Sequence, residues 1–106
     1  MKWDEFILGI VDDAETFAKD ELVDLVRTSV NDSDEFIAKQ GKKMRRYLQQ
    51  LADEEITKDE FESNILDLKA LVELQALKLA VAAKARAQRI SDGIQNLVID
   101  SLLKLI

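Results

Sequence analysis

Apolar residues recur every three or four positions along almost the whole chain, which is the spacing of one face of an α-helix. The first apolar seam consists of Trp3, Ile7, Val11, Ala14, Ala18, Leu22 and Leu25. Its steps add up to an eleven-residue repeat, which is typical of nearly straight or slightly right-handed helix packing. The pattern predicts one long helix over residues 3–30.

A polar run, Asn31 to Asp34, interrupts this pattern. Asp32 can cap a following helix through its carboxylate, and Glu35 stands three residues later, as in a capping box. We therefore expect a second helix over residues 34–53. The phase of the apolar seam would also fit a helix that continues through residue 33, so the separation of the first two helices stays open.

The sequence around Thr57 carries the clearest signal of a helix start. The Thr57 hydroxyl can accept a backbone amide proton while Glu60 reaches back, and Ile56 and Phe61 can form a hydrophobic staple. From Lys58 the helical pattern persists to Ile106, so we expect a third helix over residues 58–106. The Ser91-Asp92-Gly93 sequence could break it near Gly93, but the seam passes through in phase, which favours continuity.

The length of this third helix indicates an association. Its 49 residues would form a rod of about 73 Å, whereas a globule of this size has a radius of gyration of about 13 Å. The apolar stripe would be exposed unless the helix folds back near Gly93 or pairs with another chain. We expect an all-α single domain, residues 1–106, forming an elongated helical bundle or a coiled-coil-like homo-oligomer, above all a dimer. The expected interface residues are Leu79, Ala83, Ala87, Ile90, Ile94, Leu97 and Leu102.

Composition narrows the chemistry that the chain can perform. Its 106 residues include no Cys, no His and no Pro, which excludes thiol nucleophiles, imidazole bases and most transition-metal sites. A di-iron bundle lacks its His ligands, and the acidic segments lack the spacing of a calcium loop. We expect no enzymatic activity, no metal and no cofactor.

One basic cluster is the main candidate for binding. Lys39, Lys42, Lys43 and Arg46 share one helix face, and Arg45 lies beside them. They could form a phosphate-binding strip for nucleic acid or anionic lipid. Alternatively, they neutralise the first helix, because residues 1–30 contain eight acids and three bases. A single aromatic residue, Tyr47, is too little for base stacking. We favour charge matching and expect no nucleic-acid partner.

The remaining signals concern location and partners. Two acids within the first five residues are unlike a signal peptide, and no segment is apolar enough to span a bilayer, so we expect a cytoplasmic acidic protein with a formal charge of -6. The expected function is a non-enzymatic interaction or scaffold protein that self-associates. The alternative is a protein that reversibly coats a lipid or particle surface, similar in size, charge and amphipathicity to phasins and exchangeable apolipoproteins. The Ala-rich segment 77–90 favours close helix packing over a membrane surface.

Overall fold

The structure is a computed structural model that describes residues 1–9 and 16–106, with only the backbone of residues 16–18 described. These residues are helical throughout, apart from short connections, and contain no strand. The helices are α1 (Trp3–Gly9), α2 (Thr16–Val30), α3 (Glu35–Ala52), α4 (Lys58–Ala76), α5 (Val81–Gly93), the π-helix η1 (Ile94–Leu102) and α6 (Leu103–Leu105).

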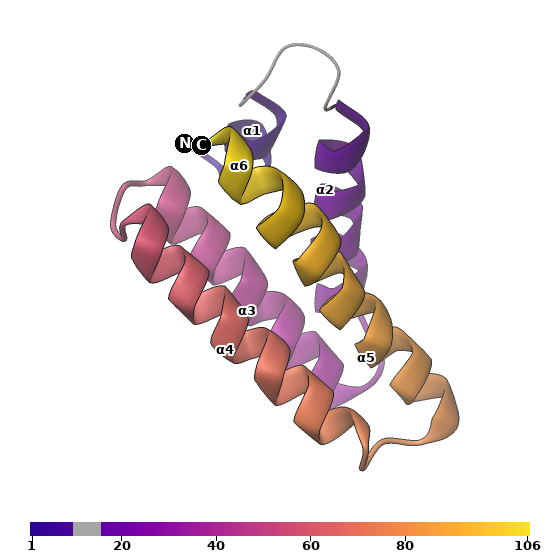
Figure 1. Cartoon of the computed structure of the whole chain (residues 1–106). Coiled ribbons are helices and arrows are strands. Elements are labelled where there is room, and N and C mark those ends of the chain that lie inside the picture. Colours follow the sequence, from indigo (N-terminus) through magenta and orange to yellow (C-terminus); the bar gives the residue numbers. More distant parts are fainter. Residues whose placement is uncertain (10–15) are drawn as a thin grey trace.

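Four rods form the body of the molecule (Figure 1). Helices α2, α3 and α4 follow one another through short connections, and α5, η1 and α6 continue directly into one another as the fourth rod. Each rod packs on the next, and η1 packs back on α2, which closes the ring. Helix α1 lies against α2 and α3 at the end of the bundle where both chain termini meet. One hydrophobic core fills the ring.

The predicted long first helix is wrong, because α1 and α2 lie side by side. Arg27 forms an ion pair with Asp4 at 2.6 Å, although the two residues are 23 positions apart. In one straight helix that separation would place them about 35 Å apart. Helices α1 and α2 are therefore two separate helices packed against each other. Of the predicted seam, Val11, Ala14 and the side chain of Ala18 lie outside the described residues.

The predicted second helix is confirmed, but its cap is not the one expected. Asp34 is the N-cap, and its carboxylate accepts a hydrogen bond from the Ile37 amide at 3.1 Å. Asp32 stands two residues earlier, where it accepts from the Asp34 amide at 2.8 Å and pairs with Arg86. Helix α2 ends at Val30, so the first two predicted segments are separate.

The third predicted helix begins where expected but is broken elsewhere. The capping box is confirmed: the Thr57 hydroxyl accepts from the Glu60 amide at 3.1 Å, and the Glu60 carboxylate accepts from the Thr57 amide at 2.9 Å. The helix is continuous through Gly93, as the seam favoured, but it is interrupted between Ala76 and Val81. A single rod over residues 58–106 is therefore wrong.

The break has a tertiary cause. Residues 77–80 contain no Gly or Pro, and Ala80 starts α5 in an extended conformation without a side-chain cap. Reversing the chain here buries the apolar seam of residues 83–102 against α2 and α4. The resulting extents are 39 × 25 × 21 Å with a radius of gyration of 13.2 Å. The predicted elongated assembly gives way to a compact chain of the size expected for a globule of this length.

The helices of the described residues differ from membrane spans in length and hydropathy. None of those in residues 1–9 and 16–106 is both long and apolar enough to cross a bilayer.

Candidate functional site

The residues expected at a subunit interface lie together in the core of the single chain. Leu79 and Leu97 are half-buried against that core, and the others are buried: Ala83, Ala87, Ile90, Ile94 and Leu102. The helices that carry the buried ones, α5 and η1, pack on the chain's own α2 and α4 and do not present these residues to a partner. Residues 83–102 therefore leave no exposed apolar stripe for a partner. Self-association stays a prediction, and it needs a different surface.

Glycines explain two of the closest contacts of that core. Gly93, considered above as a possible break, lies where the Leu25 side chain approaches η1, and a Cβ on Gly93 would clash with Leu25 Cδ2. Gly41 lies against the end of α2. Gly93 is thus a packing residue within a continuous rod, not a point where the chain turns.

The basic cluster lies on the face of α3 that points away from the core. Lys39, Lys42, Arg45 and Arg46 are exposed and Lys43 is half-buried. None of the ion pairs that the described residues form involves any of them. Two acids of α1 and α2 pair with other bases, Asp4 with Arg27 and Asp24 with Arg89. Charge matching with the first two helices is therefore not formed among the described residues.

A hollow lies next to this basic face, between the start of α1 and the C-terminal half of α3. Its volume is about 610 Å³. Lys42, Arg45 and Arg46 line it together with Trp3 and Gln50. The Arg46 guanidinium lies 5.5 Å from the centre of the Tyr47 ring, which favours a cation–π contact and restrains its position. This side of the molecule can therefore present several cations to one ligand.

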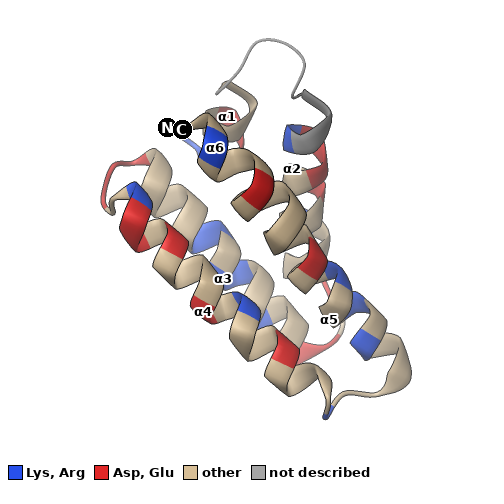
Figure 2. Ribbon diagram, in the orientation of Figure 1, with Lys and Arg blue, Asp and Glu red and all other residues tan. Residues whose placement is uncertain are grey.

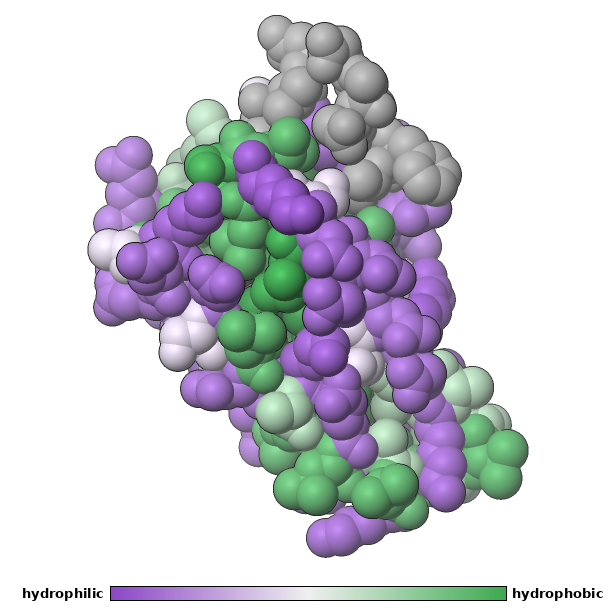
Figure 3. Space-filling view, viewed as in Figure 1, coloured by the Kyte–Doolittle hydropathy of each residue, from purple (hydrophilic) through white to green (hydrophobic). Residues whose placement is uncertain are grey.

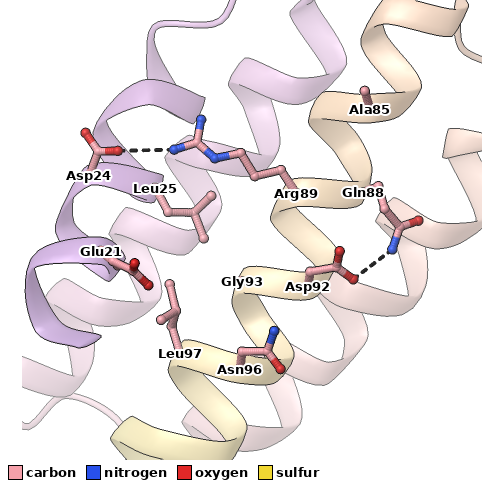
Figure 4. A pocket seen from close by; sticks show the side chains of 10 residues that line it. All are labelled: Glu21, Asp24, Leu25, Ala85, Gln88, Arg89, Asp92, Gly93, Asn96 and Leu97. Carbon is pink, nitrogen blue, oxygen red and sulfur yellow. Dashed lines mark hydrogen bonds and ion pairs between the residues drawn. The ribbon is translucent and has the colours of Figure 1, made fainter. Parts of the chain in front are cut away.

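A polar groove of about 510 Å³ separates α2 from α5 and η1 (Figure 4). Glu21 and Asp24 face it from α2, and Gln88, Asp92 and Asn96 face it from the opposite wall. Arg89 crosses the groove to Asp24 at 3.1 Å. Among the described residues no three carboxylates lie close enough together to hold a metal ion. The groove offers hydrogen-bonding groups but no pair arranged as acid and base.

Exposed apolar side chains gather at the corner where α4 turns into α5 (Figure 3). Leu74 is 60% exposed, Leu77 76% and Val81 84%, and Leu66, further back along α4, is 42% exposed. Leu66, Ala70, Leu74 and Leu77 follow one another at steps of four, four and three, so they form a stripe on the outside of α4. We call these four residues the α4 outer face.

The sequence analysis missed this face although a signal was present. The predicted seam contained the inner residues of α4, Phe61, Ile65, Leu68 and Val72, which are buried. The second set of apolar residues repeats at the same helical spacing, about half a turn away from the first. This second set, which the core does not bury, is the signal by which the face could have been found in the sequence.

Charge is distributed unevenly along the α4 outer face (Figure 2). Residues 53–62, at and before its N-terminal end, contain six acids and one base, whereas residues 74–91 contain four bases and no acid. Figure 2 shows the acidic residues at the turn before α4 and the basic residues along α5. The N-terminal end of the face therefore lies next to an acidic segment and its C-terminal end next to Lys78 and Lys84, while Glu73 also lies at that end and Arg86 and Arg89 pair with Asp32 and Asp24.

Titratable groups with displaced pKa values tie the helices together. Partial burial acts to raise the pKa of Asp32, but the Asp34 amide and the Arg86 guanidinium outweigh it and leave the pKa lowered. The Lys69 ammonium and the Ser91 hydroxyl lower the pKa of Glu73, whose carboxylate accepts from Ser91 at 2.8 Å. These carboxylates connect α5 to the α2–α3 turn and to α4, so their role is structural.

The described surface thus offers a basic face with an adjacent hollow, a polar groove and an apolar α4 outer face. The chain matches no protein-family model, no curated protein and no solved structure.

Proposed function

We propose that this chain is a non-enzymatic, cytoplasmic helical interaction domain that self-associates as a dimer through the α4 outer face. One observation supports this above all: an apolar stripe at helical spacing lies uncovered on an α-helix whose other apolar face is already buried in the core. The proposal keeps the expected self-association but moves it from the C-terminal rod to α4.

The charge distribution favours two copies of α4 that run in opposite directions. In that arrangement the acidic segment at the N-terminal end of each face lies over the C-terminal end of the other, near the partner's Lys78 and the partner's Lys84. A parallel arrangement would place like charges together. Asp59 and Glu62 stand seven and four residues before Leu66 on the same helix face, so they are the acids of α4 nearest the N-terminal end of the stripe.

The side chains of the stripe fit a two-fold axis near Ala70. Leu66 and Leu74 stand four residues on either side of it, so Leu66 of one copy would meet the partner's Leu74. The small Ala70 side chain lets the two helix backbones come close at the crossing point. Leu77 and Val81 would extend the contact at both ends.

The strength of this contact can be judged from burial. Covering the exposed part of each Leu or Val contributes roughly 1 kcal/mol or more. In a two-fold dimer both copies contribute these side chains, so each contribution counts twice. The loss of free motion on association opposes this with about 4–15 kcal/mol. We therefore expect a weak dimer whose population depends on protein concentration.

Sedimentation velocity over a roughly hundredfold range of protein concentration tests the proposal. We expect the wild type to shift from the 12.0 kDa monomer towards twice that mass, and Leu74→Asp to remain monomeric with an unchanged helical spectrum. Leu8→Asp is the matched control, because Leu8 is 47% exposed on α1, outside the stripe. Higher salt should weaken the dimer, since opposite charges face each other in it.

A monomeric wild type at every concentration would refute self-association. In that case binding to vesicles with anionic lipids, lost in Leu77→Asp, would favour the surface-coating alternative, because Leu77 and Val81 stand beside Lys78 and Lys84. A dimer that persists unchanged in Leu74→Asp would place the interface elsewhere and refute the role of α4.

A further inference from the structure

We propose that the basic face of α3 and the hollow beside it bind a compact ligand that carries two or more phosphate groups. The basic face consists of Lys39, Lys42, Lys43, Arg45 and Arg46. It lies on α3, so this binding is independent of the self-association proposed for α4.

The first support is electrostatic. Residues 36–52 of α3 contain these five bases and no acid. The described residues offer them no ion pair, although the chain's other three arginines, Arg27, Arg86 and Arg89, are all paired. Like charges this close repel one another and destabilise the helix slightly. A bound anion would relieve that repulsion.

The second support is shape. Three of the cations, Lys42, Arg45 and Arg46, line the hollow of about 610 Å³ between α1 and α3. Arg45 also lines a neighbouring hollow of about 230 Å³ that reaches α2, so its side chain stands between the two. A concave surface brings several donors to one ligand, and guanidinium groups hold phosphate oxygens in a bidentate manner.

Acidic residues at the edge of the hollow do not cancel these cations. Asp53 lines the hollow, but its carboxylate already accepts a hydrogen bond from the Gln49 side-chain amide at 2.9 Å and one from the N-terminal amino group at 3.4 Å. These contacts hold the pKa of Asp53 below its usual value, so it is a paired carboxylate. Glu55 also lines the hollow, after the end of α3, so three cations face two carboxylates there and positive charge remains in excess.

The size of the ligand follows from the overall charge. The chain carries a formal charge of -6, which repels an extended polyanion such as nucleic acid or an anionic membrane. Screening limits electrostatic attraction to about 8–10 Å in physiological salt, so a compact anion senses mainly the five nearby cations. The basic face also lacks exposed large apolar residues, which a membrane surface would require. A small, multiply charged phosphate compound fits best.

Isothermal titration calorimetry with tripolyphosphate, ATP and adenosine tests the inference. The first two ligands share phosphate groups and the last lacks them, so we expect binding of tripolyphosphate and ATP with similar affinity and none of adenosine. The double variant Lys42→Glu/Arg46→Glu should weaken binding by about tenfold or more, since it reverses two of the contacts. The control Lys104→Glu changes charge at an exposed site on α6 and should leave binding within about twofold.

The outcomes separate clearly. Absence of tripolyphosphate binding at low salt, or equal binding by Lys42→Glu/Arg46→Glu, overturns the inference. ATP binding without tripolyphosphate binding shows that the base, not the phosphate, is recognised and overturns it as well. Tighter binding of RNA or anionic vesicles through the same residues would assign the face to another class of partner. If the double variant does not fold, Lys42→Gln/Arg46→Gln removes the charges without repulsive acids and decides the question.

Discussion

Gly41 is the residue at which α3 comes closest to the end of α2, and replacing it tests how tightly these helices pack. A Cβ at this position would lie 2.5 Å from the Val30 amide nitrogen and 2.6 Å from the Ser29 carbonyl carbon. Both are backbone atoms, so they cannot move aside by a change of rotamer. Carbon atoms prefer separations of about 3.5–4.0 Å. The α2 terminus would have to shift by about 1 Å.

Two effects oppose each other in Gly41→Ala. Alanine favours the interior of a helix over glycine by roughly 1 kcal/mol, and no glycine of the described residues has a positive φ that would require it. Overpacking in a close-packed region costs about 1–3 kcal/mol, or more when backbone atoms must move. The clash should prevail, and we expect a net loss of about 1–2 kcal/mol, or a fall in melting temperature of roughly 5–10 °C.

Thermal unfolding followed by circular dichroism measures this change, and Gly9→Ala is the matched control. Gly9 also lies in a helix, but its Cβ would meet no atom of the described residues within 4 Å. We expect Gly9→Ala to leave stability unchanged or to raise it by less than about 1 kcal/mol. If Gly41→Ala proved as stable as the wild type or more so, the close approach of α2 and α3 would be refuted.

Three further predictions concern individual groups. Thr57→Ala should lower stability by about 1 kcal/mol in urea unfolding, because it leaves the Glu60 amide without its cap; an unchanged midpoint would contradict the capping box. Gln40→Leu should stabilise the protein by about 1 kcal/mol or more, since Gln40 Oε1 is buried and meets no donor among the described residues; destabilisation would indicate an additional hydrogen bond. The folded-state pKa values of Asp32, Asp53 and Glu73 are lowered, so these groups stabilise the folded protein above their unfolded pKa values and lose that contribution as pH falls below about 4. The urea midpoint should therefore fall in that range, and it should fall less in Asp32→Asn. A wild-type urea midpoint that does not change with pH there would contradict this prediction.

Local chemistry made the helix class and one helix start predictable from sequence. The side chains of Thr57 and Glu60 satisfy amides within one turn of each other, so their pattern determines the start of α4 without any distant contact. Asp34 was harder, because Asp32 and Asp34 can both serve as caps. The choice depends on Arg86, which lies 54 residues away and holds the Asp32 carboxylate. A local pattern cannot register that ion pair.

The reversal of the chain at residues 77–80 left no such pattern. Residues 77–80 contain only Leu, Lys and Ala, all of them good helix formers, yet the helix is broken there. Breaking a helix costs a few hydrogen bonds, while folding back buries Ile90, Ile94 and Val98 completely. Long-range burial outweighs local preference, and it can be recognised only by asking whether a rod of about 73 Å could cover its own seam.

The candidate surfaces were predictable to different degrees for the same physical reason. A seam of helical period indicates that a face is buried but not which chain buries it, and so the residues from Ala83 to Leu102 suggested a second copy although the chain itself covers them. Leu66, Leu74 and Leu77 stand outside the seam that the core needs, so folding does not explain them. The basic residues of α3 are comparable: they are compatible with a folded chain, but the described structure supplies no counter-charge. Exposed apolar or basic residues that do not contribute to the core are therefore the better guide to partners. The two groups that support the proposals above are the α4 outer face and the basic face of α3.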